Sequence, residues 1–290
     1  MIFLDPTSDI GFKKLFANAA HKDIVISFLN SVLGRVEGEK IVDVEINDPH
    51  NLPKVLKLKS SIVDVRCSDQ KGKQYIVKIQ AKQQTFYAAN SIRPELVEGY
   101  YSAIALGEQL AHKENYKQLL PVIFIGVLDF VLFNNNPHYI SHHFILDSET
   151  HAHELTHLEF HFIELKKFNK KENELDTILD KWIYLLNEAE KLEEIPKTLQ
   201  NPEFDDAFQL LSRSNWSKAE LTAYERYKDD IRSHEGQLDF AEQKGKMEGK
   251  LEGKLEVAKQ LLDILDVETI AKKTGLSIKQ IKDLKKESKE

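Results

Sequence analysis

Apolar and polar residues recur with two different periods along the chain, and the change of period predicts its elements. Near the N-terminus, apolar residues recur every three or four positions, which predicts helices over 5–16 and 22–33. Alternation with period two follows at 40–47, 60–67 and 74–81 and predicts three strands. Residues 69–72, Asp-Gln-Lys-Gly, predict a hairpin turn, so the second and third strands are expected to be adjacent and antiparallel.

The remainder of the chain is expected to pass from one helix to three strands and then to a helical half. Residues 85–112 predict a helical segment, in which Pro94 would break an upstream helix but could be the first residue of a new one. The nearly continuous apolar run at 119–129 predicts a strand covered on both faces, and 140–146 and 155–165 predict two more. From 174 onward the pattern is helical, and 267–284 predicts a helix, a turn and a second helix.

Composition narrows the class of protein. The chain has 290 residues, and 40 Lys and Arg against 47 Asp and Glu give a net charge of −7. Apolar residues make up 41%, which suffices for a buried core, and no stretch is apolar and long enough to predict a membrane span. The single cysteine excludes a disulfide scaffold and fits a reducing compartment, so we expect a cytoplasmic protein. The acidic balance means that any binding of nucleic acid needs a local basic patch.

One acidic and two polar residues are predicted to share a sheet face. Asp64 is out of phase with the apolar Val63 and Val65, and Lys78 and Gln80 stand two residues apart on the neighbouring strand. Such residues converge on one face of an antiparallel pair. A carboxylate there can bind Mg²⁺, which prefers oxygen ligands, and an amide can orient a water or a phosphate. Taken alone, the pattern favours an ordinary solvated sheet face.

Nine segments, taken in chain order, carry a resemblance to a known family. They read DPTSDIGFKKLF, KDIVISFLNSVL, SSIVDVRCSD, YIVKIQ, LLPVIFIGVLDFVLF, HLEFHFIEL, LDKWIYLLNEAEKL, NWSKAELTAYE and ETIAKKTGLSIKQIKDL. This ordered set resembles the Rpn family of recombination-promoting nucleases and transposases, within the PD-(D/E)XK nuclease superfamily. No single segment is decisive, but together they span nearly the whole chain.

The resemblance implies an α/β fold: a PD-(D/E)XK restriction-endonuclease-like mixed sheet flanked by helices, followed by a mainly α-helical C-terminal half. It implies a nuclease-like domain at 1–170, a helical region at 171–240, and a Gly/Lys/Glu-rich helical linker with a small helix-turn-helix-like tail at 241–290. It also implies a magnesium-dependent endonuclease that acts on DNA in transposition or recombination, with a metal-bound water attacking the phosphodiester.

Four residues can be compared with the family pattern for the site. Asp64 matches the central metal-binding aspartate, and Gln80 matches the glutamine that ends the Glu-x-Gln strand motif. Asp9 matches a recurrent acidic position near the site. Lys78 departs from the pattern, because the family has glutamate there as the second metal carboxylate and an ammonium group repels the ion. The replacement acid would have to come from the following helix, as Glu95 or Glu98.

A second departure is the segment SIRPELVEG at 91–99, where the family has a shorter helical connection. It resembles a translated bacterial palindromic repeat, and it is also compatible with a loop that leads into a helix. Two interpretations follow from the departures. The chain is either a nuclease weakened by Lys78, or a catalytically inactive relative that still binds DNA or forms an oligomer.

Basic residues suggest where DNA would be contacted. Lys57, Lys59, Lys73 and Lys82 can flank the site and contact phosphates, or form a solvated charged rim. The lysine-rich C-terminal helix pair can touch DNA as a helix-turn-helix or serve as an apolar oligomerisation hairpin. We therefore expect DNA as a partner and a homo-oligomer formed through the C-terminal helices, with no membrane contact.

Two further groups of reactive residues are expected to be structural. His157, Glu159 and His161 share one strand face, whose spacing permits a metal site, but the apolar residues between them favour a half-buried strand. Cys67 is in phase with the apolar Val63 and Val65 and is predicted to be a small core residue.

Overall fold

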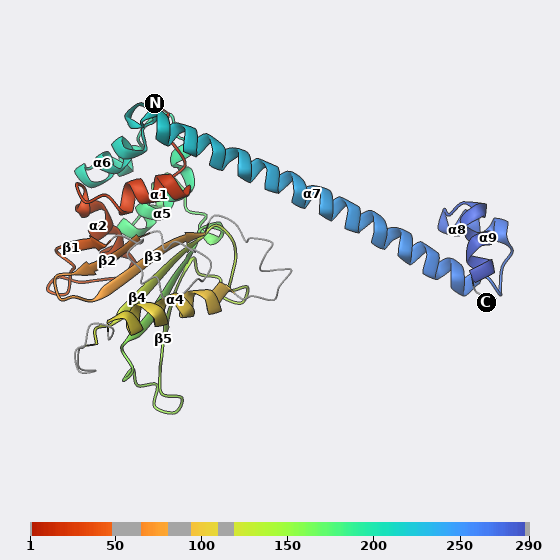
Figure 1. Cartoon of the computed structure of the whole chain (residues 1–290), viewed down its shortest axis with the longest axis horizontal. Helices are drawn as coiled ribbons and strands as arrows, with labels where there is room; N and C mark the ends of the chain where they lie inside the picture. Colours follow the sequence, from red (N-terminus) through yellow and green to blue (C-terminus); the bar gives the residue numbers. More distant parts are fainter. Residues whose placement is uncertain (1, 48–64, 81–93, 110–118, 288–290) are drawn as a thin grey trace. The chain divides into compact units, whose positions relative to one another are not determined.

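The computed structural model describes residues 2–47, 65–80, 94–109 and 119–287, and these form two compact units, Met1–Tyr224 and Glu225–Glu290. The first unit is built around one six-stranded sheet (Figure 1). Its strands are β1 (Val44–Asn47), β2 (Val65–Asp69), β3 (Gln74–Gln80), β4 (Val122–Leu128), β5 (Ile140–Phe144) and β6 (Leu158–Glu164).

The sheet is mixed, and its strand order is β1-β2-β3-β4-β6-β5. The first three strands pair antiparallel, β4 lies parallel to β3 and β6, and β5 pairs antiparallel with β6. The predicted hairpin joins β2 to β3: the Asp69 amide donates to the Lys73 carbonyl at 3.0 Å, and Gly72 has φ of 79°. Only glycine adopts that backbone conformation at little cost, so the turn and the antiparallel pairing are both confirmed.

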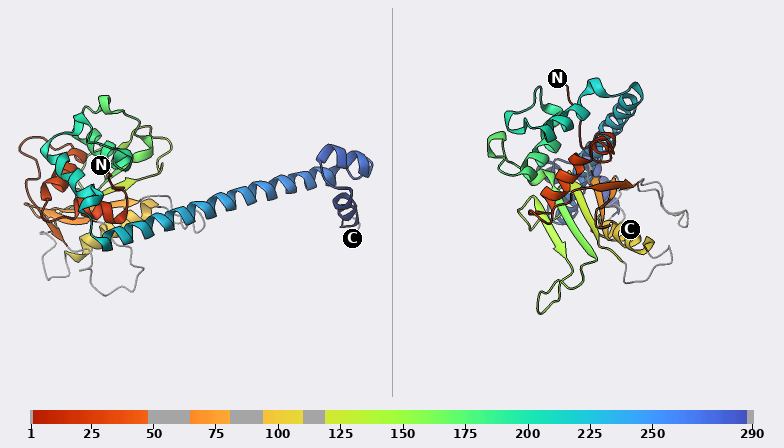
Figure 2. Two further views of the ribbon diagram at one scale, coloured as in Figure 1. Left: turned by 90° about the horizontal axis from the view of Figure 1, so that it is seen from above. Right: turned by 90° about the vertical axis from the view of Figure 1, so that its left-hand side faces the viewer.

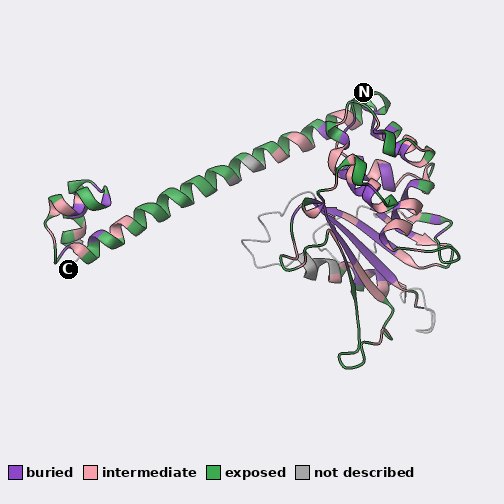
Figure 3. Ribbon diagram, turned by 180° about the vertical axis from the view of Figure 1, so that it is seen from behind, coloured by how far each residue is buried: buried purple, intermediate pink, exposed green. Residues whose placement is uncertain are grey.

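Helices cover both faces of the sheet (Figures 1 and 2). One face packs against α1 (Asp9–Phe16), α2 (Lys22–Val32), α5 (Ile178–Glu188) and α6 (Pro202–Leu211). The other face packs against α4 (Pro94–Glu108), which begins at Pro94 as the sequence predicts. All residues of β4 are buried, which agrees with its continuous apolar run (Figure 3).

An aromatic cluster joins the helical layer into one core. The Trp182 ring of α5 lies 4.5 Å from Phe204 of α6, 5.8 Å from Phe16 of α1 and 6.2 Å from Phe28 of α2, measured between ring centroids. All four side chains are fully buried, and the Trp182 Nε1–H donates to Ser27 Oγ at 3.0 Å. Helices from the predicted 171–240 region therefore share their core with the first 170 residues. Short 3₁₀ turns connect these elements: η2 (Leu165–Lys167), η3 (Glu172–Glu174), η4 (Ala189–Lys191), η5 (Lys197–Leu199) and η6 (Arg213–Asn215).

The second unit contains most of α7 (Lys218–Leu261) together with α8 (Val267–Thr274) and α9 (Ile278–Glu287). A capping box begins α7, because the Glu220 amide donates to Ser217 Oγ and the Ser217 amide donates to the Glu220 carboxylate. The predicted helix, turn and helix of the tail are also present, with Gly275 in the left-handed conformation at the turn. A small apolar core holds them together: Ala258, Leu262, Ile270, Leu276 and Ile281. No helix among the described residues combines the length and apolarity that a bilayer crossing requires.

Asp180 links the helical layer to the end of the sheet and gives a testable stability contribution. Its fully buried carboxylate accepts from Tyr139 Oη at 2.8 Å, Lys170 Nζ at 2.9 Å and the Thr177 amide at 3.0 Å. Burial raises the pKa of Asp180, but these hydrogen bonds outweigh burial, and the net pKa lies below the usual value of 3.8.

Asp180→Asn is therefore expected to lower the free energy of unfolding at pH 7 by about 2 kcal/mol, because the buried side chain loses its charge-assisted hydrogen bonds and the partly exposed Lys170 loses its ion-pair partner. Since the folded pKa is depressed, the wild-type contribution is present above pH 4 and is lost as the pH falls through the folded pKa. Urea unfolding at pH 7 and pH 3 measures both effects, and the difference between wild type and variant should shrink at pH 3. The exposed Asp176→Asn is the control and should change stability by less than about 0.5 kcal/mol. Equal stability of Asp180→Asn and wild type at pH 7 would contradict this assignment.

Candidate functional site

Lys78 and Gln80 lie side by side on the face of β3 that is covered by α4. Alternate residues of a strand share a face, and here Ile76 on the same face packs in the α4 cluster. In the parallel ladder with β4, Lys78 is opposite Gly126 and Gln80 is opposite Leu128. The half-buried Lys78 ammonium lies 5.7 Å from the centroid of the Tyr101 ring on α4, within the range of a cation–π contact.

Gln80 carries a buried amide oxygen that lacks a hydrogen-bond partner. Its side chain is only 8% exposed, and no described residue donates to Oε1. Leaving such an atom unsatisfied costs about 1–3 kcal/mol, so native structures rarely contain one without a reason such as a ligand contact. The backbone of Gln80 is held firmly, since its carbonyl accepts from the Asp129 amide at 3.0 Å.

Two other residues of the predicted site lie elsewhere. Asp9 belongs to α1, in the layer on the opposite face of the sheet, and its carboxylate pairs with Lys13 Nζ at 2.9 Å. Among the described contacts, none joins Asp9 to Lys78 or Gln80. Lys73 precedes β3 and stands five residues before Lys78, about 17 Å along an extended strand. The structure thus brings together Lys78 and Gln80, while Asp9 and Lys73 come from other regions.

Several predicted residues fall outside the described part of the chain. These are Asp64, Lys57, Lys59 and Lys82, and their roles stay predictions. Residues 91–93 of the 91–99 segment are likewise outside it. Glu95 and Glu98 belong to the start of α4, but the positions of their side chains are not described, so their role as replacement acids also stays a prediction.

The described residues at the Lys78–Gln80 face do not fit a magnesium ion. Magnesium requires oxygen ligands in octahedral geometry, and Lys78 offers an ammonium group where the family has a carboxylate. The Gln80 amide oxygen is the one described group here that suits the ion. Across the described ranges, moreover, no cluster of three or more His, Cys, Asp or Glu side chains is arranged to hold a metal.

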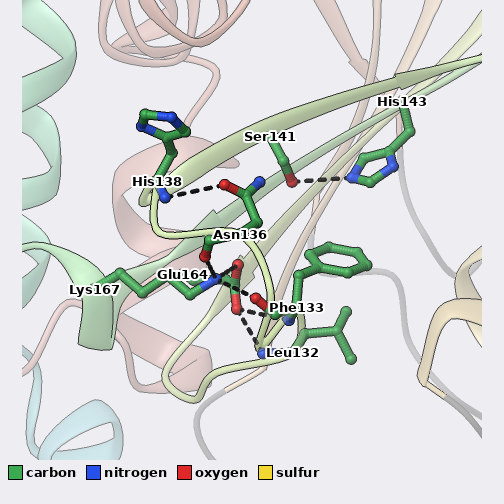
Figure 4. Close-up of polar contacts among 8 residues, drawn as sticks. All are labelled: Leu132, Phe133, Asn136, His138, Ser141, His143, Glu164 and Lys167. Atoms are coloured by element: carbon green, nitrogen blue, oxygen red, sulfur yellow. Dashed lines mark hydrogen bonds and ion pairs between the residues drawn. The ribbon is translucent and has the colours of Figure 1, made fainter.

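A buried polar cluster lies where β6 ends (Figure 4). Glu164 is 1% exposed and accepts from the amides of Leu132 and Phe133 and from Lys167 Nζ. Lys167 Nζ also donates to the carbonyls of Phe133 at 2.8 Å and Asn136 at 2.7 Å. Both charges have partners, so this ion pair stabilises the connection between β4 and β5.

A cavity of about 390 Å³ lies next to the same end of β4, and its carboxylates are already paired. Asp129 contacts Lys166 Nζ at 2.7 Å, and Glu188 contacts Lys191 Nζ at 2.9 Å. Glu190 accepts from the Tyr224 hydroxyl at 3.0 Å. These contacts account for the acidic lining of the cavity as structural ion pairs and hydrogen bonds.

Of the remaining reactive residues, Cys67 behaves as predicted. It is fully buried on β2, and burial, with a smaller contribution from Asp69, raises the pKa of its thiol to about 12. A thiol with that pKa is not nucleophilic at neutral pH.

The histidines of β5 and β6 make a contact that the sequence does not predict. His161 Nδ1 lies 2.6 Å from Nδ1 of His142, which belongs to β5. Only the register between β5 and β6 identifies this pair, and no sequence spacing does.

The family scan gives one match, to the PD-(D/E)XK nuclease family transposases, over residues 6–239. No curated protein and no solved structure matched the chain. The matched range contains the whole sheet, the helices on both of its faces and the Lys78–Gln80 pair. The mixed sheet with flanking helices and the helical C-terminal part agree with the fold of that superfamily. The chain belongs to the PD-(D/E)XK nuclease family transposases.

Proposed function

We propose that this chain is a DNA-directed phosphodiesterase of the nuclease and transposase type, whose metal-dependent hydrolysis is weakened by Lys78. Membership of the family supports a nuclease or transposase type of function. The observation that carries the proposal is the Lys78–Gln80 pair, which shares one face of β3 and in which the buried amide oxygen of Gln80 has no hydrogen-bond partner among the described residues. A single buried cysteine is consistent with action in the cytoplasm.

The chemistry of the two side chains fits a phosphate group. A lysine ammonium donates hydrogen bonds to phosphate oxygens, and a glutamine amide can both donate to a phosphate and accept from a water. The chain as a whole is acidic, with a net charge of −7, so DNA binding needs local positive charges. In this proposal the Lys78 ammonium is one of them.

Asp64 is the metal-binding carboxylate in this proposal. It directly precedes Val65, which pairs with Val77 across the β2–β3 ladder, and Val77 directly precedes Lys78. A unit charge at 4 Å contributes on the order of 4 kcal/mol at an effective dielectric constant of 20, so an ammonium in place of a carboxylate weakens metal binding strongly.

Lys78→Glu is expected to raise magnesium-dependent cleavage of plasmid DNA by at least tenfold, because it replaces a repelled cation with a carboxylate ligand. Adding Asp64→Ala to that variant should abolish the gained activity. Lys73→Glu is the matched control, because it makes the same charge change at the opposite end of β3 and should restore nothing. Cleavage by the wild-type chain at the rate of Lys78→Glu would contradict the weakening by Lys78. Absence of DNA cleavage by every form would overturn the catalytic proposal.

The second candidate function is a catalytically inactive relative that binds DNA. The contact between Lys78 and the Tyr101 ring favours it, because it orients an ammonium group on the sheet face, where a phosphate can be contacted. In this case Lys78→Met should weaken DNA binding to the same extent in magnesium and in chelator. The slope of log affinity against log salt concentration should also decrease by about one, which corresponds to one lost phosphate contact. Loss of all binding in chelator would exclude this candidate.

Gln80→Met tests whether the unpartnered amide serves a ligand. Removing a buried oxygen to which no described residue donates should raise the free energy of unfolding by about 1 kcal/mol while weakening DNA binding. Gln74→Met on the same strand is the control: Gln74 Oε1 accepts from Arg66 at 2.9 Å, so its loss should destabilise the fold. Denaturant unfolding and a DNA-binding titration measure the two effects. A destabilised Gln80→Met variant with normal DNA affinity would show that the amide is structural.

We propose that a second copy of this chain binds along α7. The sequence repeats Gly-Lys-(Met or Leu)-Glu three times at 245–256, so the helix carries four parallel rows of identical side chains. Met247 is 72% exposed and Leu251 is 42% exposed, and their row continues through Leu255 into the apolar core of the tail. Three glycines each destabilise the helix by about 1 kcal/mol relative to alanine, so an exposed helix of this composition gains from a partner.

The charges beside this apolar row select the orientation of the partner. Lysines precede each apolar residue and glutamates follow it, so one flank of the row is basic and the other is acidic. In a parallel pair of identical helices, the basic flank of one faces the acidic flank of the other, whereas an antiparallel pair places like charges together. The pattern therefore supports a parallel homodimer.

Leu251→Glu is expected to convert the dimer to a monomer, because it places a charge in the apolar row. Light scattering of the full chain measures the mass. Gly249→Ala, on the opposite row where an added Cβ meets nothing within 4 Å, is the control and should leave the dimer intact. In a Cys67→Ala background, Met247→Cys should form a disulfide across the pair only if the helices are parallel. A wild-type chain that is monomeric at micromolar concentration would contradict the proposal.

A further inference from the structure

The strand pair at the free edge of the sheet carries two histidines in direct contact. His142 on β5 and His161 on β6 are cross-strand partners, and their Nδ1 atoms are 2.6 Å apart. At that distance one ring donates its proton to the other, so each imidazole aims a nitrogen at the same point between the strands. His161 is 3% exposed, whereas His142 is exposed to solvent.

A carboxylate stands behind the buried histidine. Glu159 Oε2 lies 3.7 Å from Nε2 of His161, and that nitrogen is buried and has no hydrogen-bond partner among the described residues. This separation is too long for a hydrogen bond but short enough for a small side-chain rotation to close it. A carboxylate on one nitrogen of a histidine and a metal on the other is the usual arrangement around metal-binding histidines.

We propose that His142 and His161 bind one borderline divalent ion, such as Zn²⁺, Ni²⁺ or Cu²⁺, through their Nδ1 atoms, with Glu159 orienting His161. Imidazole ligands select these ions over Mg²⁺ and Ca²⁺, which prefer oxygen. The site therefore differs in ligand chemistry from the oxygen-ligand site expected of the nuclease family.

Ion binding requires the two rings to separate and to turn. Zinc–nitrogen bonds of about 2.0–2.1 Å at a tetrahedral angle place the two nitrogens about 3.3 Å apart, so the rings must separate by about 0.7 Å from their present contact and rotate until each lone pair points at the ion. His142 lies at the edge strand and is exposed, which gives room for that movement and for waters to complete the coordination. Two protein ligands make a weaker site than three.

The direct contact between the two Nδ1 atoms has to open before an ion can bind there. Ion binding then requires a tautomer change in one ring: the proton between the Nδ1 atoms moves to an Nε2, and both Nδ1 lone pairs become free.

The test is a titration of the untagged full chain with Zn²⁺ or Ni²⁺ alone, read by calorimetry. One ion per chain should bind, and millimolar Mg²⁺ should not compete. His142→Gln should weaken binding at least tenfold, and Glu159→Gln by about tenfold. The matched control is His143→Gln, whose Nε2 contacts Ser141 Oγ at 3.0 Å instead, and it should bind within twofold of wild type.

Three results would overturn the site: no stoichiometric binding at 1 mM ion, unchanged affinity in His142→Gln, or equal loss in His143→Gln. A second measurement needs no variant. Addition of Zn²⁺ to the ¹⁵N-labelled wild-type chain should shift the Nδ1 resonances of two histidines and no more. Shifts spread over many histidines would show surface binding and contradict the proposal. None of these readouts depends on DNA cleavage, so the outcome is independent of the proposed nuclease function.

Discussion

Every other part of the first unit depends on the parallel pairing of β3 with β4. The hydrogen bonds of this ladder run from Gln74 opposite Val122 to Gln80 opposite Leu128, and β4 is buried along its whole length. Because a fully buried strand has no solvent to satisfy its backbone, both neighbours must be present, and β3 and β6 supply them. The same ladder sets the height at which Lys78 and Gln80 stand on the face beneath α4.

That sheet carries two buried polar regions, and they have different roles. At the carboxyl end of β6, Glu164 and Lys167 satisfy each other and several backbone groups, so their burial stabilises a connection. On β3, the buried oxygen of Gln80 has no partner among the residues that the structure describes. Buried charges that satisfy each other have a structural explanation, whereas a buried polar atom with no described partner suggests a ligand. This contrast is why the Lys78–Gln80 face, and not the Glu164–Lys167 pair, is the candidate site.

The long helix α7, unlike the sheet, is not stabilised by a buried core along most of its length. Its stretch at 240–254 has no core to pack against within its own unit, and its composition of Gly, Lys and Glu makes a weak helix. The row of Met247 and Leu251 supplies apolar surface for a partner, and the charged rows on either side supply orientation. Partner binding along α7 would thus compensate for a helix that is marginal by itself.

The sequence by itself determined the order and type of most elements, because their hydrophobic periods and turn residues are local signals. The hairpin at 69–72, the helix starting at Pro94, the apolar β4 and the capping boxes at Ser217 and Ser277 all follow from neighbouring residues. The family resemblance identified Lys78 as a departure at a ligand position. Only the tertiary structure decided which residues meet, since that depends on strand order and register over long separations. It placed Asp9 in the opposite layer and joined His142 to His161 across β5 and β6, a pair that no local spacing encodes.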